Sequence, residues 1–211
     1  MKKILYTLIV AVALLVVPTT ASAQLNLSRL LGGISKVTSQ MQTEQSTDNP
    51  YSRLAESAPS AYQLNGTWRF ESASFSYLGN NPLADIVIAQ VDPIIGQTLQ
   101  QLGFTAGSVT LRLTNGKGVI MQGEHALNGS YSYTRSKAAI VASTTFNDKS
   151  VSASGYVRYS GGQLTVLLDA RELINALTTV MPELKQDQNV IMVQTLLKDL
   201  KDVYVAGKFS K

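Results

Sequence analysis

Side chains that could carry out covalent or acid–base chemistry are sparse in this 211-residue chain. It has no cysteine and a single histidine, His125, which directly follows Glu124. A serine nucleophile would need that histidine beside it, and the serines here follow ordinary strand alternation. A metal centre needs several His, Cys or carboxylate ligands close together. We therefore expect no catalytic residues, no metal ligands and no cofactor.

The carboxylates do not suggest an acid–base couple either. Asp169 and Glu172 have the spacing of a helix capping box, with the aspartate as the cap. Asp92 precedes a proline, where it would also cap a helix, and Glu71 stands alone in a strand-like run. A general acid or base has to be positioned against the reacting group, and no pair here has that arrangement. The sequence favours a protein without enzymatic activity.

The first 23 residues have the pattern of a secretory signal peptide. Lys2 and Lys3 precede an apolar run from Ile4 to Val17, and Ala21-Ser22-Ala23 matches a cleavage site. The run is shorter than the roughly 20 residues that a membrane span needs. We expect an exported protein, periplasmic or secreted, with no transmembrane segment after cleavage. Without a cysteine it cannot be an acylated lipoprotein.

The charge gives no sign of a polyanionic partner. Signal cleavage removes two of the 18 basic residues and none of the 14 acidic ones, so the net charge falls from +4 to +2. Binding to nucleic acid depends on a basic surface, and no basic patch with interleaved aromatic residues is present. We expect no nucleic-acid partner.

The rest of the chain is dominated by short alternating runs. In "LNGTWRF" the only tryptophan, Trp68, follows Gly66 by two residues, and strict alternation would place Phe70, Ser72, Ser74 and Ser76 on its face. Asn-Gly, Asn-Asp and Gly-Gly turn signals separate the later runs. The predicted strands are 66–78, 107–114, 118–125, 129–135, 138–146, 150–160, 163–168 and 202–210. Many short, evenly spaced strands are typical of a barrel or a sandwich.

Helical segments interrupt these strands. An insertion after strand one, at 80–103, has a broad apolar face, and a second after strand seven covers 169–181. A third segment, 188–200, precedes the last strand. Residues 24–61 are rich in Ser, Thr, Gln and Asn, so we expect a polar, partly flexible leader before a barrel domain at 62–211.

The motif around Trp68 resembles the G-x-W hallmark of lipocalin and fatty-acid-binding barrels. In those barrels the tryptophan plugs the closed end and a basic residue of the last strand stacks over it. The resemblance implies that Gly66, Trp68 and Lys208, in "AGKFS", close the barrel. A cation over an indole face is favourable by about 0.5–2 kcal/mol.

A longer pattern strengthens this resemblance. The signal peptide, "LNGTWRF", "LGFTAGSVTLRL", "GGQLTVLLDARELINAL" and "VYVAGKF" are together similar to a secreted lipocalin-like family of Bacteroidetes proteins, a domain of unknown function. The resemblance implies an eight-stranded antiparallel lipocalin-like (calycin) barrel and an exported location. It supplies no catalytic residues.

The barrel interior is therefore the predicted site. Eight strands enclose a space that side chains just fill or that holds one small ligand. We expect a binding module for a small apolar or amphipathic molecule. The predicted wall is Trp68, Phe70, Leu111, Leu113, Met121, Tyr131 and Tyr133, and the predicted cover is Ile86, Val87, Ile94 and Ile95. The alternative is a structural or interaction protein that docks to a cell-envelope partner, with a side-chain-filled barrel in which the helices act as a plug.

Overall fold

The computed structural model describes residues 50–79, 81, 84, 88–89, 92, 100, 104–146, 148–186 and 188–211. The predicted signal peptide (1–23), the first part of the predicted leader (24–49) and most of the predicted insertion at 80–103 lie outside these residues. Within that insertion the described residues Ala84, Ile88, Ala89, Asp92 and Gln100 are helical. In the described part of the chain, no helix is both long enough and apolar enough to cross a membrane.

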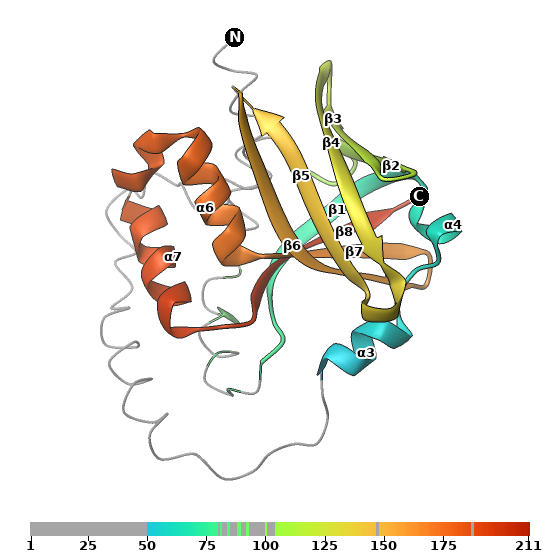
Figure 1. Cartoon of the computed structure of the whole chain (residues 1–211), viewed down its shortest axis with the longest axis horizontal. Helices are drawn as coiled ribbons and strands as arrows, with labels where there is room; N and C mark the ends of the chain where they lie inside the picture. The colour runs from blue at the N-terminus through green and yellow to red at the C-terminus, as the bar shows by residue number, and fades with distance from the viewer. Residues whose placement is uncertain are drawn as a thin grey trace.

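Eight antiparallel strands, paired in chain order, close into a barrel, which confirms the expected fold class (Figure 1). The strands are β1 (Gly66–Tyr77), β2 (Val109–Thr114), β3 (Lys117–Gln122), β4 (His125–Thr134), β5 (Ala139–Phe146), β6 (Lys149–Ser160), β7 (Gln163–Asp169) and β8 (Val203–Ser210). The pairing of β1 with β8 completes the ring. In a closed ring each strand has a neighbour on both sides, so the sheet has no free edge wherever its strands are paired.

A β-bulge in β1 changes which residues face the interior. The register with β8 shifts between Phe70 and Ser72, so Glu71 is an extra residue on β1. Trp68 and Phe70 face inward before the bulge, and Ala73 and Phe75 face inward after it. The prediction that Ser72, Ser74 and Ser76 continue the face of Trp68 is wrong, because an extra residue reverses the two-residue alternation.

The turn predicted at Asn128-Gly129 is also wrong. Strand β4 runs straight through both residues, and the reversal between β3 and β4 occurs at Gly123 and Glu124. Gly129 has a different role, because a Cβ atom there would lie 2.7 Å from the carbonyl oxygen of Ser143 on β5. The glycine therefore permits close approach of two strands.

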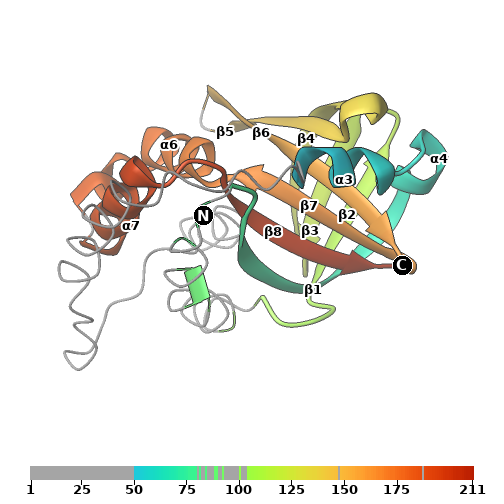
Figure 2. The ribbon, with the colours of Figure 1, turned by 90° about the horizontal axis from the view of Figure 1, so that it is seen from below.

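Helices occupy opposite ends of the barrel. After β7 come α6 (Ala170–Val180), the 3-10 helix η2 (Pro182–Gln186) and α7 (Gln188–Asp199). Before β1 come α3 (Pro50–Glu56) and α4 (Ala61–Leu64), and η1 (Arg135–Lys137) joins β4 to β5. Figure 2 shows α6 and α7 at one end, and α4 and the C-terminus at the other.

Helix α6 lies along a part of β6 that pairs with β5 on one side but has no strand partner on the β7 side. Pairing between β6 and β7 begins at Gly155, so Lys149–Ser154 extend beyond β7. Glu172 of α6 accepts hydrogen bonds from the backbone N–H and the hydroxyl of Ser154, and Lys149 Nζ donates to the carbonyl oxygen of Thr179 at 2.7 Å. The helix takes the place that a longer β7 would occupy.

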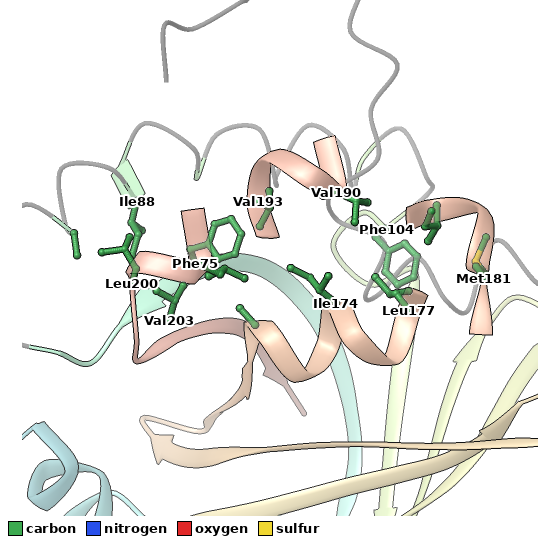
Figure 3. Close-up of a cluster of buried hydrophobic side chains, with 14 of the residues drawn as sticks. Phe75, Ile88, Phe104, Ile174, Leu177, Met181, Val190, Val193, Leu200 and Val203 are labelled. Carbon is green, nitrogen blue, oxygen red and sulfur yellow. The ribbon is translucent and has the colours of Figure 1, made fainter. Parts of the chain in front are cut away.

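An apolar cluster joins α6 and α7 to the barrel. Ile174 and Leu177 of α6 pack with Val190 and Val193 of α7, and Figure 3 shows them gathered with Phe75, Phe104 and Val203. The predicted helix cap at Asp169 is confirmed: its carboxylate accepts the N–H groups of Arg171 and Glu172 at 2.9 and 3.0 Å. Burial of one apolar face is what holds such short helices in place.

The described part of the predicted leader packs against the barrel wall. Leu54 of α3 is buried in a cluster that includes Leu167 of β7 and Tyr204 of β8. The Tyr51 hydroxyl donates to Asp202 Oδ1 at 2.7 Å, just before β8. Residues from α3 onward therefore belong to the packed domain.

This contact predicts a loss of stability at alkaline pH. Burial raises the pKa of Tyr204 to about 12, and burial with the hydrogen bond to Asp202 raises the pKa of Tyr51 above its ordinary value of 10.0. The folded state holds these protons more tightly than the unfolded chain does. Their contribution to stability is therefore complete below about pH 10 and is lost as the pH rises toward about 12.

Urea unfolding over this pH range measures the effect. We expect the free energy of unfolding to fall more steeply in the wild type than in the double variant Tyr51→Phe, Tyr204→Phe. Tyr62→Phe is the control, because Tyr62 is 88% exposed, and it should keep the wild-type slope. Identical slopes in all three proteins would contradict this account.

Candidate functional site

The barrel interior contains a cavity of about 270 Å³, lined by residues from all eight strands and from α6. The lining residues are predominantly apolar. For comparison, an engineered apolar cavity of roughly 150 Å³ is enough to bind benzene. The space in this barrel is sufficient for a larger molecule.

Small residues at lining positions account for the cavity. Ala73, Gly118, Ala142, Ala153 and Gly207 contribute from five different strands. In a close-packed interior, each such position would have to be matched by a large side chain opposite it. The lining side chains do not fill the space that these residues leave.

The structure places most of the predicted wall residues around this cavity. Phe70, Leu111, Leu113 and Tyr131 all belong to its lining. The prediction for Met121 is wrong, because Leu111 pairs with Ile120, which lines the cavity, while Met121 pairs with Thr110 on the other face. A strand was predicted here, but its inward and outward positions were shifted by one residue.

The predicted cover is not tested by the described part of the structure. Ile86, Val87, Ile94 and Ile95 lie outside the described residues. Leu173 and Ala176 of α6 line the cavity, as does Phe104 just before β2. The sequence signal for the α6 pair was present in their three-residue spacing, which puts them on one helix face.

Trp68 lies at the closed end, in the packed cluster beneath the cavity. It is 0% exposed, and its indole Nε1 donates to the carbonyl oxygen of Leu64 at 2.9 Å. The ring meets Tyr159 edge to face, with centroids 6.1 Å apart. Tyr133 belongs to the same cluster, so Trp68 and Tyr133 seal the barrel base, where the prediction made them ligand contacts.

The basic residue over this tryptophan is Lys211, and the prediction of Lys208 is wrong. Lys211 Nζ lies 4.7 Å from the indole centroid, whereas Lys208 is exposed and pairs with Ser72 on the outer side of the wall. Gly66 has φ +145°, and a Cβ there would come within 3.2 Å of Lys211 Cε. The predicted roles of Gly66 and Trp68 in closure therefore fit the geometry, with Lys211 as the third member.

A strap formed by residues 57–65 covers the closed end. Pro59 accepts the Tyr133 hydroxyl at 2.7 Å, and Asn65 exchanges two hydrogen bonds of 3.1 Å with Asn115 in the β2–β3 turn. Burial raises the pKa of the Tyr133 phenol, which keeps it as a neutral donor. This strap was not predicted, although Ser60 and Gln63 form a capping box that signals the start of α4.

Charged groups are absent from the described lining. Its polar residues carry only hydroxyls: Tyr131 and Thr144 occupy inward positions, whereas Ser130, Ser143 and Ser152 occupy the alternate, outward positions of their strands. Among the residues that the structure describes, no group of three or more His, Cys, Asp or Glu could hold a metal ion. Glu124 lies in the β3–β4 turn and His125 begins β4, and neither lines the cavity. The arrangement suits the enclosure of an apolar molecule.

A second hollow, of about 350 Å³, lies between α6 and α7. The guanidinium of Arg171, which lines this hollow, donates to the carbonyl oxygens of Leu197 and Leu200 at 2.8 and 2.9 Å. These bonds satisfy the end of α7, so we assign Arg171 a structural role.

Comparison with known proteins gives one family. A family model described as a lipocalin-like domain (DUF4923) matches residues 36–211. No curated protein and no solved structure matches the chain. The matched range contains all eight strands, the strap and the helices that follow β7.

The closed end generates a direct prediction. Lys211→Ala should lower the free energy of unfolding by about 0.5–1 kcal/mol and shift the emission of Trp68, because the indole loses its cation. Trp68 is the only tryptophan, so fluorescence-detected urea unfolding reports on this site alone. Lys208→Ala makes the same charge change and should alter neither quantity. Equal destabilisation by the two variants would refute the assignment of Lys211.

Proposed function

Since the chain belongs to the lipocalin-like domain (DUF4923) family, we propose that it is an exported module that binds one small apolar or amphipathic molecule inside its barrel. The observation that carries this proposal is the apolar cavity of about 270 Å³, with Phe70, Leu111, Leu113 and Tyr131 in its wall. Small-molecule sites are commonly enclosed, mostly apolar spaces with a few polar groups.

The apolar character of the lining supports an occupant. The cavity is partly open, so without a ligand its apolar residues face water or unfilled space. A bound apolar molecule would remove this surface from water, which is favourable by roughly 25 cal/mol per Å². The alternative of a side-chain-filled barrel in a structural or interaction protein has no such support.

We propose that α6 acts as a lid and not as a plug. Its residues Leu173 and Ala176 lie against a space that remains open beneath them. Polar contacts from Glu172 and Thr179 fix the helix to the overhanging part of β6. These polar contacts, one near each end of the helix, would hold it over the cavity. Breaking them would let the helix separate from β6.

Export and the lack of catalysis are parts of the same proposal. The signal-peptide pattern of residues 1–23 supports a periplasmic or secreted protein, of Bacteroidetes origin on the sequence resemblance, and the lack of cysteine is inconsistent with a lipoprotein. We propose binding without a reaction because, among the described lining residues, the polar side chains carry only hydroxyls.

A cavity-filling variant tests the proposed function. Ala142 lines the cavity, so Ala142→Phe should occupy part of it and weaken binding of the apolar fluorophore N-phenyl-1-naphthylamine by at least about tenfold, or roughly 1.4 kcal/mol. Fluorescence titration measures the dissociation constant, and circular dichroism confirms that each variant folds.

The matched control is Ala126→Phe. Ala126 is exposed on the outer face of β4, so the same added ring there should leave the dissociation constant unchanged. Wild-type affinity in a folded Ala142→Phe variant would show that the fluorophore binds elsewhere and would count against the proposal.

A further inference from the structure

We propose that the cavity selects uncharged molecules and rejects carboxylates, so that its ligand is a neutral apolar compound whose polar groups are limited to hydroxyls or carbonyls. This inference rests on the proposed function, because it concerns the same cavity. It narrows the ligand from any apolar or amphipathic molecule to a neutral one.

The chemistry of the lining is the first support. Every described residue in contact with the cavity is uncharged, from Phe70 on β1 to Phe209 on β8. Tyr131 is the only one of them with a titratable group, and its hydroxyl donates to Asn65 Oδ1 at 3.3 Å. No described lining residue could form an ion pair with a carboxylate inside the barrel.

Four charged side chains of the described residues, on β6, on α6 and at position 211, are bonded elsewhere. Lys149 donates to the carbonyl oxygen of Thr179, and Glu172 accepts from Ser154, so both hold α6 in place. Lys211 lies over Trp68 at the closed end. The guanidinium of Arg171 donates to the carbonyls that end α7. None of these four groups lines the cavity.

Two inward hydroxyl-bearing residues, Tyr131 and Thr144, suit a neutral polar group. Thr144 shares the inward face of Ala142 on β5, whereas Ser130, Ser143 and Ser152 pair with one another on the alternate, outward face of the wall. The Thr144 hydroxyl donates to the carbonyl of Asn128 at 2.8 Å. An alcohol or a carbonyl needs one or two such partners, whereas a carboxylate also needs a compensating charge.

The energetic consequence is steep discrimination. Moving an ionised carboxylate from water into an apolar site without a partner is so unfavourable that the group takes up a proton instead. A carboxylic acid would then bind only in its protonated form. Its apparent affinity should fall about tenfold for each pH unit above its pKa, which for a simple carboxyl lies near 4–5.

A matched pair of compact ligands tests this inference. Adamantane-1-methanol and adamantane-1-carboxylic acid share one compact, rigid hydrocarbon body and differ only in the head group. Each competes with N-phenyl-1-naphthylamine for the wild-type protein, at about pH 7.5 and again near the carboxyl pKa of about 5. The alcohol should bind equally well at both pH values. The acid should bind roughly 100-fold more weakly than the alcohol at the higher pH and recover most of that loss at the lower pH.

The outcomes separate this inference from the proposed function. Equal affinity for the acid and the alcohol at about pH 7.5 would overturn the selection of neutral molecules and leave the binding function standing. Failure of both ligands and of the fluorophore to bind would overturn the proposed function, and this inference with it. Ala142→Phe should weaken the alcohol and the protonated acid together. Acid binding that this folded variant retains would place the carboxylate outside the cavity and would also overturn the inference.

Discussion

Closure of the wall by the pairing of β1 with β8 is the constraint on which the rest of this structure depends. Once eight strands form a ring, each inward residue shares one enclosed space with residues from seven other strands, and the sum of their volumes decides whether that space is filled. Large side chains gather at the two ends, around Trp68 at one and around Phe75 and Ile174 at the other. Alanine and glycine occupy several lining positions between them. The result is a barrel with packed apolar clusters toward its two ends and an apolar cavity between them.

Different interactions hold the two ends of the barrel together. At the closed end a tryptophan that is fully removed from solvent is held by one hydrogen bond to Leu64, an edge contact with Tyr159 and a lysine above its ring. At the other end α6 replaces missing strand pairing beside β6 and contributes Leu173 to the cavity. The closed end is therefore fixed by tight packing, whereas the helical end depends on an apolar helix face with polar contacts at its edges. This difference supports the proposal that α6, at the helical end, acts as the lid.

The sequence predicted the strands well and the facing of individual residues less well. Turn signals and alternation identified eight strands because they are local features of the chain. A shift of one residue, however, exchanges the inner and outer faces. The bulge at Glu71 reversed the assignment of Ser72–Ser76, and an error of one residue in β3 exchanged Met121 for Ile120. Lys211 was not predicted because it follows the last residue of β8, where strand alternation no longer places side chains. The strap was missed because its contacts join residues far apart in the chain, such as Tyr133 and Pro59.

The central claim is that a small molecule occupies the space between these two ends. Methyl-resolved NMR during titration with adamantane-1-methanol tests it most directly, because alanine methyls lie both inside and outside the wall. We expect saturable shifts at Ala142 and Ala153, with no change at the outward Ala126 or at the indole N–H of Trp68. An unchanged spectrum at saturating ligand, or shifts confined to Ala126 and its outer surface, would contradict the claim.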